Sequence, residues 1–374
     1  MNSGIRTIGV LTSGGDCAGL NAVIRAVTYS AIQTYGWKVY GIMDGSMGLI
    51  QRPLQFRELT MGTFGGNYLR EGGTFLGTTN KGDPFNFPMP DGTIKDRSEE
   101  FAEGCRMLGL DALVVIGGDG SMRILSRLCE RAGIGMVGVP KTIDNDVHGT
   151  DYAVGFATSI NVVTEALDRL QPTAASHHRV MILEVMGRDA GHIAINSGIA
   201  GGADVILVPE VPYSLDGVAR KIRTVLAQGR SHALVVVAEG VKTESGEPFM
   251  ISYSGGQQRY GGIGNYLTEK IAQMTGAETR VTILGHVQRG GIPSTRDRLL
   301  ASAFGVKAVD LVAQKQFGTM VGWQGRSVVA VPLEKVCIGP RSLDPCGTMV
   351  GTARGLGIYV GEEICPIEDP AATI

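Results

Sequence analysis

The sequence lacks several features that would place it in a special class of protein. It has no run of roughly 18 apolar residues, so no ordinary membrane-spanning helix is expected. Its formal net charge of −2 gives no reason to expect nucleic acid or a membrane surface as a partner. The first residues, MNSGIRTIGVLTSGG, lack the basic region and long apolar core of a secretion signal. We therefore expect a cytoplasmic protein that acts on small molecules.

The six cysteines form no C-x-x-C pair and are scattered along the chain. They are Cys17, Cys105, Cys129, Cys337, Cys346 and Cys365. This spacing disfavours a zinc site or a disulfide framework, and we expect free thiols of the cytosolic kind.

Glycine is abundant instead, with 55 residues, about twice the usual share. The glycines follow apolar runs that read as buried strands, at 7–11, 112–116, 135–139, 180–185, 205–208 and 233–240. Amphipathic helices alternate with these strands, with Ser214 as a predicted cap and Gly133 as a predicted stop. The helix over 160–171 is expected to end at Pro172.

This alternation predicts an α/β fold with largely parallel sheets covered on both faces. The length of 374 residues allows one large or two ordinary domains. Ligands of such folds bind beyond the carboxyl ends of the strands. We therefore expect the unusual polar clusters of this chain to lie at strand ends.

Two glycine clusters could bind phosphate. Gly14 and Gly15 precede a helix whose free N–H groups favour an anion, although a plain structural turn explains them equally well. Asp119 lies between Gly118 and Gly120 at a strand-to-helix junction. Its carboxylate could cap the helix, or it could hold Mg²⁺ beside a nucleotide phosphate.

A loop after the strand at 135–139 carries Asp144 and Asp146 among Lys141, Thr142 and Asn145. Ordinary turn chemistry would explain this composition. Two acids two residues apart can also divide roles, one accepting a hydroxyl proton and the other serving a metal ion.

A set of cationic residues, with glycines that leave room for a ligand, is found further along the chain. The candidates are Arg179, Arg188, Arg280, His286 and Arg289, with Gly187 and Gly285 beside them and Glu239 as a carboxylate suited to sugar hydroxyls. Guanidinium groups suit phosphate oxygens, although a single surface arginine is usually only solvated. Together these clusters indicate phosphoryl transfer to a phosphorylated, hydroxylated small molecule.

The motifs LTSGGDCAGLN, GGTFLGTTNKG, VVIGGDGS, PKTIDND, EVMGRDAGH, VPE, VVAEG and GHVQRGG occur in this order over roughly residues 6 to 300. The series resembles the 6-phosphofructokinase family. The resemblance implies transfer of a phosphoryl group from ATP, with Mg²⁺, to the 1-hydroxyl of fructose 6-phosphate. It also implies two Rossmann-like three-layer domains with the active site in the cleft between them. The larger domain would comprise 1–155 plus about 289–341, and the smaller one about 156–288 plus 342–374.

Roles for the site residues follow from the resemblance. Asp144 would be the general base, and Asp119 and Asp146 would hold Mg²⁺. Thr142 and Arg188 would stabilise charge on the moving phosphoryl group. The donor would contact Gly14, Gly15, Asn80, Lys81, Gly118, Asp119, Gly120, Ser121 and Lys141. The sugar phosphate would contact Thr142, Asp144, Asp146, Arg179, Met186, Gly187, Arg188, Glu239, Arg280, His286 and Arg289.

Two residues of the sequence point to different phosphoryl donors. Gly120 stands where members that use ATP keep room for the α-phosphate, whereas Lys141 is typical of members that use pyrophosphate. We give Gly120 more weight, because an acid at this position would exclude a nucleotide, while ATP could also use a lysine. Pyrophosphate remains the alternative donor, and a non-catalytic sugar-phosphate-binding homologue is the second alternative.

The resemblance also implies a homotetramer or homodimer in which Arg179 and Arg280 reach into a neighbouring subunit's site. Asn80 departs from the bacterial ATP enzymes, which carry an arginine at this position, and Lys81 could substitute for it. The resemblance implies an allosteric enzyme. Arg25 matches a basic residue of the effector pocket, but Tyr29 and Gln171 stand where arginines would be expected, so the sequence does not favour ADP or phosphoenolpyruvate as the effector. An NAD or lipid kinase would not need the later motifs MGR and QRGG. A dinucleotide-dependent oxidoreductase would need a G-x-G-x-x-G fingerprint, which is missing after the first predicted strand of this chain.

Overall fold

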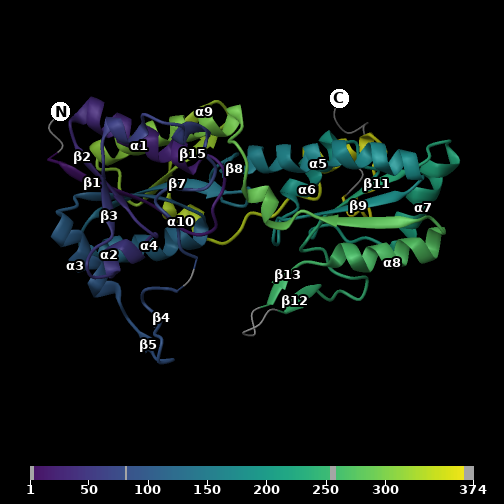
Figure 1. Ribbon diagram of the computed structural model, residues 1–374, viewed down its shortest axis with the longest axis horizontal. Coiled ribbons are helices and arrows are strands. Elements are labelled where there is room, and N and C mark those ends of the chain that lie inside the picture. Colours follow the sequence, from purple (N-terminus) through teal and green to yellow (C-terminus); the bar gives the residue numbers. More distant parts are fainter. Residues whose placement is uncertain (1–3, 81, 253–257, 366–374) are drawn as a thin grey trace. The chain divides into compact units, whose positions relative to one another are not determined.

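The computed structural model describes residues 4–80, 82–252 and 258–365. It divides into two compact units (Figure 1). Unit 1 comprises Met1–Thr158 and Arg289–Pro340, and unit 2 comprises Ser159–Gln288 and Arg341–Ile374. No helix in the described ranges is long and apolar enough to cross a membrane.

Unit 1 is built on an eight-stranded sheet with the order β16-β15-β7-β6-β1-β2-β3, and β8 extends β7 on one side. The five inner strands run parallel, whereas the edge strands β3 and β16 are antiparallel to their neighbours. The strands are β1 (Thr7–Thr12), β2 (Lys38–Ile42), β3 (Phe56–Leu59), β6 (Ala112–Gly117), β7 (Gly135–Thr142), β8 (Val154–Gly155), β15 (Thr319–Gln324) and β16 (Ser327–Pro332).

Helices cover both faces of this sheet, as its continuous apolar strands predict. In Figure 1, α1 (Leu20–Tyr35) and α9 (Thr295–Ala313) lie above the sheet and pack along each other. On the other face lie α2 (Met47–Ile50), α3 (Ser98–Leu108), α4 (Asp119–Ala132) and α10 (Leu333–Val336). Shorter elements are η1 (Met61–Phe64), η2 (Tyr68–Arg70) and the hairpin β4 (Phe87–Pro88) with β5 (Ile94–Lys95).

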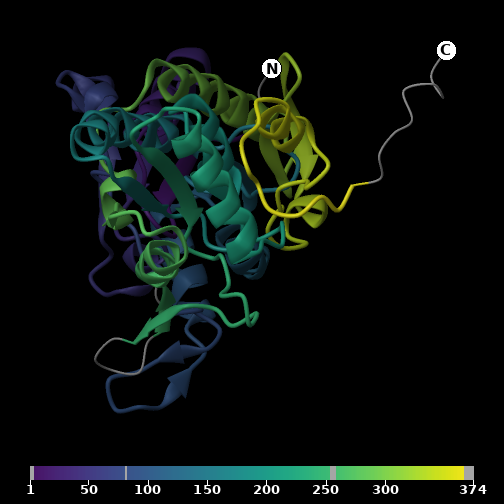
Figure 2. The same ribbon diagram turned by 90° about the vertical axis from the view of Figure 1, so that its right-hand side faces the viewer.

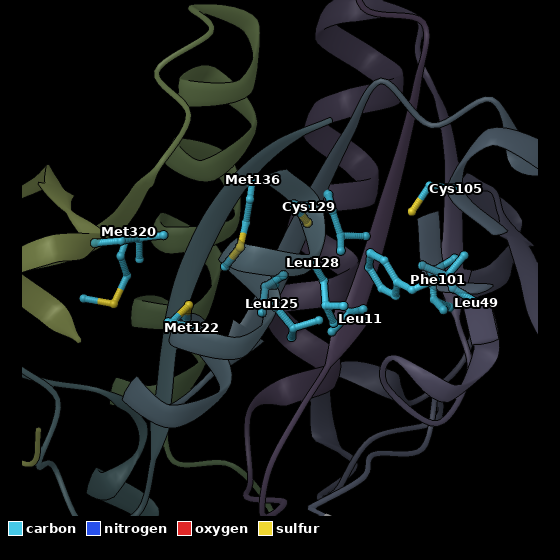
Figure 3. Close-up of a cluster of buried hydrophobic side chains, with 14 of the residues drawn as sticks. Leu11, Leu49, Phe101, Cys105, Met122, Leu125, Leu128, Cys129, Met136 and Met320 are labelled. Carbon is cyan, nitrogen blue, oxygen red and sulfur yellow. The ribbon is translucent and has the colours of Figure 1, made fainter. Parts of the chain in front are cut away.

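The core under α3 and α4 fixes the orientation of α4. Figure 3 shows Leu125 and Leu128 of α4 pointing into a cluster with Leu11, Phe101 and Met136. Gly133 ends α4 with φ +69°, as expected. The start of α4 is therefore held firmly at the carboxyl end of β6.

Unit 2 contains a four-stranded parallel sheet with the order β10-β11-β9-β14. Its strands are β9 (Val180–Val185), β10 (Val205–Leu207), β11 (Ala233–Ala238) and β14 (Thr279–Ile283). The helices are α5 (Phe156–His177), α6 (His192–Ala200), α7 (Leu215–Ala227), α8 (Ile263–Thr275) and α11 (Thr348–Gly355), with η3 at Gly285–Arg289. A small hairpin pairs β12 (Met250–Ser252) with β13 (Gln258–Tyr260). The predicted α/β class with parallel sheets is confirmed.

The prediction that Pro172 ends its helix was wrong. The helix α5 continues through Pro172 to His177. Beyond the proline, Ala174 is fully buried against Met181 and Leu234. Burial of this last turn offsets the hydrogen bond that a proline removes.

The expectation of six free thiols was wrong for two cysteines. Cys346 and Cys365 form a disulfide with their Cα atoms 5.6 Å apart. The C-terminal segment folds back on the start of α11, which a separation of 19 residues did not reveal. Cys17, Cys105, Cys129 and Cys337 are free.

Candidate active site

The first glycine cluster forms a turn at the carboxyl end of β1. Gly14 adopts φ +86°, which favours glycine, and a Cβ atom there would lie 3.2 Å from Lys141 Nζ and 3.4 Å from Ser121 Oγ. The Lys141 ammonium donates a hydrogen bond to the Gly15 carbonyl. Segments far apart in the sequence therefore meet at this turn.

The second cluster begins α4. Gly118 is the extended N-cap residue without a side-chain cap, and Asp119 is the first helical residue. A Cβ atom at Gly120 would meet nothing within 4 Å, so this position faces open space. A helix N-terminus with accessible backbone N–H groups and a nearby lysine can bind a polyphosphate.

Lys141 is a buried cation with only 4% of its surface exposed. Burial lowers its pKa, and the nearby Arg289 guanidinium lowers it further, whereas Asp144 and Asp16 raise it. Burial also raises the pKa of the adjacent Cys17 thiol to about 12, so this cysteine stays neutral. Because a desolvated cation is costly, an incoming phosphate would stabilise Lys141.

The turn after β7 brings the two predicted acids together through one hydroxyl group. Thr142 Oγ1 accepts the Asp144 backbone N–H at 3.0 Å and donates to Asp146 Oδ1 at 3.1 Å. Asn145 has φ +53°, and its side chain bonds the backbone of Ala153 at 2.9 Å. Asp144 is 4% exposed, whereas Asp146 is half-buried.

Asp119 and Asp146 both lie beyond the carboxyl edge of the unit 1 sheet. They follow the neighbouring parallel strands β6 and β7, which are in register at Gly117 and Pro140. In the described part of the chain, no group of three or more His, Cys, Asp or Glu side chains could hold a metal ion. Mg²⁺ commonly takes one or two carboxylates together with substrate phosphates, so these two acids fit that ion.

Two further donor-site predictions lie on the loop before β4. Thr79, next to Asn80, accepts the Gly14 N–H with its backbone carbonyl at 2.9 Å. Asn80 is exposed. Lys81 lies outside the described residues.

In unit 2, the loop after β9 is held by side chains from other segments. The Met186 N–H donates to Gln288 Oε1 at 2.8 Å, and the Arg188 N–H donates to Glu239 Oε1 at 3.1 Å. Gly187 has φ +149°, and a Cβ atom there would lie 2.5 Å from the Ala190 carbonyl oxygen. Arg188 itself adopts φ +52°. The structure thus brings the predicted residues Met186, Gly187, Arg188 and Glu239 together.

Arg179 and Arg280 form a separate pair at the opposite edge of the unit 2 sheet. Arg179 precedes β9, and Arg280 lies near the start of β14, beside Met181. Both guanidinium groups bond to Glu278, with Arg179 Nη2 at 2.8 Å from the carboxylate. Both arginines thus lie at strand starts, as the sequence indicates. The six residues of β9 separate Arg179 from the loop that carries Arg188.

The remaining two cations are also separated from each other. His286 in η3 is exposed within unit 2. Arg289 belongs to unit 1, where its Nη1 donates to the Asp16 carbonyl at 3.0 Å. Arg289 therefore lies against the glycine turn after β1.

Comparisons with known proteins identify the family of the chain. The Phosphofructokinase family profile matches residues 7–312. The chain belongs to the phosphofructokinase family. It is 57% identical to ATP-dependent 6-phosphofructokinase 1 of Synechocystis sp., over 96% of this chain and 99% of the relative. It is 56% identical to ATP-dependent 6-phosphofructokinase 1 of Nostoc sp., over the same shares.

A solved phosphofructokinase shares the fold. The Pichia pastoris phosphofructokinase in the T-state superposes with a TM-score of 0.76 at 32% identity. The match covers 89% of this chain and 35% of that larger chain. The predicted family is confirmed.

Three residues of this phosphofructokinase support the loop at Met186–Gly191 without having been predicted. Gln288 is 1% exposed and also donates to Ser159 Oγ at 3.3 Å. Glu210 accepts the Gly191 N–H at 2.9 Å, and burial raises its pKa. Gly240 is needed because a Cβ atom there would overlap the Arg188 carbonyl oxygen. Gln288 and Glu210 lie inside the motifs GHVQRGG and VPE, which was the available signal.

Proposed function

We propose that this protein is an ATP-dependent 6-phosphofructokinase. It transfers the γ-phosphoryl group of ATP to the 1-hydroxyl of fructose 6-phosphate and gives ADP and fructose 1,6-bisphosphate. The observation that carries the proposal is the turn Thr142–Asp146, held at the same sheet edge as the start of α4 and the buried ammonium of Lys141. Relatives at 56% and 57% identity carry the same name.

Asp144 is the proposed general base. As the sugar O1 atom bonds to the γ-phosphorus, the O–H proton passes to the Asp144 carboxylate, and the bond from the γ-phosphorus to the ADP oxygen breaks. Thr142 holds the main chain at Asp144 by accepting its N–H, which supports the positioning that phosphoryl transfer requires. Arg188 is proposed to stabilise the charge that develops on the phosphoryl oxygens.

Asp119 and Asp146 are the residues proposed to hold Mg²⁺. When bound, the ion would neutralise phosphate charge and orient the oxygens of the donor. Asp146 is available in a defined orientation because its Oδ1 accepts the Thr142 hydroxyl. Asp119 is fixed by its place at the first turn of α4.

ATP is favoured over pyrophosphate by the surroundings of Gly120. The space beside its Cα atom is open, so a nucleotide could pass there without displacing protein atoms. Lys141, the residue typical of members that use pyrophosphate, donates a hydrogen bond to the Gly15 carbonyl. It would therefore stabilise the glycine turn whether the donor is ATP or pyrophosphate.

The decisive experiment is an assay with fructose 6-phosphate and Mg²⁺ in which ATP, ADP and pyrophosphate are offered separately. We expect turnover with ATP and at least a 100-fold lower kcat/KM with the other two donors. Preference for pyrophosphate would replace the proposed donor. A folded protein that turns over none of the three would defeat the kinase assignment.

We also propose a homotetramer or homodimer with shared sites. The six residues of β9 separate Arg179 from Met186 by about 20 Å. One phosphate could not contact both ends of this strand, so Arg179 and Arg280 would serve a neighbouring copy. We propose the cytoplasm as the location, because ATP and sugar phosphates are metabolites of the cell interior.

A further inference from the structure

A cavity in unit 2 is formed by residues outside the set assigned to the two substrates. Its volume is about 450 Å³, a size that accommodates a small organic ligand. One wall is α7, and the other is the C-terminal segment from Arg354 to Glu363, drawn in yellow in Figure 2. This second wall will be called the C-terminal strap.

One face of α7 lines the cavity. Gly217, Arg220, Lys221 and Thr224 are spaced by three, four and seven residues, which places them on one side of a helix. A Cβ atom at Gly217 would overlap the ring and hydroxyl of Tyr359. The glycine therefore lets the strap approach α7 closely, while the longer side chains border the open space.

The lining is strongly basic. Arg220, Lys221 and Arg354 contribute three positive charges, and Glu363 contributes one negative charge. Among the described residues, neither Arg220 nor Lys221 forms an ion pair with a carboxylate. In contrast, Arg230 of the same unit pairs with Asp204 at 2.6 Å. The cavity thus concentrates positive charge that the protein leaves largely uncompensated.

The strap that forms the second wall of this solvent-open cavity is held in several places. The Tyr359 N–H donates to the Asp204 carbonyl at 3.0 Å, and the Glu362 N–H donates to the Pro212 carbonyl at 2.7 Å. Ser214 Oγ, which caps α7, also donates to Glu362 Oε1 at 2.8 Å. Arg354 Nη2 donates to the Glu362 carbonyl at 2.8 Å. The cavity is therefore preformed, which lowers the entropy cost of binding.

We propose that this cavity is a binding site for a small phosphate-bearing anion, with Arg220, Lys221 and Arg354 as its cationic ligands. A phosphate dianion would neutralise the net charge of the lining, and the Arg220 guanidinium offers paired N–H donors to its oxygens. Free phosphate and a phosphate ester share this chemistry, and the volume favours an ester because free phosphate fills only part of it.

Isothermal titration of the full-length protein tests the proposal. Inorganic phosphate and glycerol 3-phosphate are titrated separately, each with saturating fructose 6-phosphate and an unreactive ATP analogue, so that the substrate sites are filled. We expect one additional site per subunit, with tighter binding of glycerol 3-phosphate. Equal affinity for both probes would instead assign the site to free phosphate. The double variant Arg220→Ser with Lys221→Ser should bind at least tenfold more weakly.

Matched variants separate this site from general charge effects. Arg223→Ser removes a cation from the same helix whose Nη2 donates to the Met274 carbonyl and does not line the cavity, so binding should be unchanged. Glu363→Gln removes the one acid of the lining and should tighten binding several-fold. Lys221→Arg should retain binding.

Identical binding in the wild type and the folded double variant, or no additional site in the wild type, would overturn the proposal. Turnover without added phosphate should be the same in all these variants, because none of the residues belongs to the proposed catalytic machinery. A failure here therefore leaves the phosphofructokinase assignment unaffected.

Discussion

The guanidinium of Arg289 lies so close to Gly15 that a Cβ atom on that glycine would be 2.6 Å from Nη1. The same nitrogen donates to the Asp16 carbonyl at 3.0 Å, and Lys141 donates to the Gly15 carbonyl. Two cations from distant segments therefore meet at Gly15, and Arg289 occupies the space that a side chain there would need.

Gly15→Ala should displace Arg289 and weaken substrate binding. The clash involves the end of a flexible side chain, so the fold should survive with a small change in Tm. We expect KM for fructose 6-phosphate to rise at least tenfold in steady-state kinetics. Gly66→Ala is the control, because a Cβ atom there meets nothing within 4 Å. An unchanged KM in Gly15→Ala would show that Arg289 does not contact the substrate from this position.

Asp144→Ser should lower kcat by about 10³-fold or more while the Kd for fructose 6-phosphate stays within a few-fold of the wild type. Serine lacks the carboxylate that accepts the proton, and Thr142 still has the backbone N–H of position 144 as a partner. Steady-state kinetics and calorimetry measure the two quantities. A near-native kcat would remove Asp144 from the base role.

Gly120→Asp should impair the use of ATP. The new carboxylate would project into the open space beside α4, where it would obstruct and repel the nucleotide phosphates. We expect KM for ATP to rise by more than tenfold. Gly120→Ala is the control for the loss of glycine itself. If the aspartate variant used ATP as well as the wild type does, the ATP phosphates would bind elsewhere.

Gln288 should act as a positioning residue for the loop that carries Arg188. Gln288→Leu leaves the buried Met186 N–H without an acceptor, which costs about 1–3 kcal/mol of the free energy of unfolding. We expect a raised KM for fructose 6-phosphate, with recovery in Gln288→Glu, which restores an acceptor. A lower Tm with an unchanged KM would indicate a purely structural role.

Mixing two inactive variants should test the shared sites. Asp144→Ser and Arg280→Ala are each expected to be nearly inactive alone. When their subunits are mixed by reversible dissociation, a site with intact Asp144 and a neighbour's intact Arg280 should regain activity. Mixing Asp144→Ser with Asp119→Ala is the control, because both residues belong to the same unit 1 of one chain. No recovery in the first mixture would place Arg280 in its own subunit's site or outside the reaction.

The parallel sheets were predictable because their strands are buried on both faces and therefore read as unbroken apolar runs. Strand β11 is fully buried along Ala233–Ala238, for example. Local rules failed where distant packing decides the outcome. The residues around Pro172 do not indicate that Ala174 will be buried against Leu234, 60 positions later in the chain.

The candidate site was predictable where its residues follow strands. The bond between the Arg188 N–H and Glu239 agrees with the expectation that the ends of adjacent parallel strands meet. The contact of Arg289 with Asp16 crosses 273 residues and obeys no periodicity, so it could not be predicted. The positioning role of Gln288 could not be predicted either, because it depends on the burial of the side chain and on its hydrogen bond with the Met186 N–H.

The bridge between Tyr359 and β10 has a practical consequence for anyone who shortens this chain. Strand β10 is the last strand of its sheet on that side, and the Tyr359 carbonyl and N–H bond the backbone of Ile206 and Asp204. Truncation before Tyr359 would leave this edge open to pairing with a strand of another molecule. Such truncated proteins should aggregate on concentration, so a shortened chain should retain Tyr359.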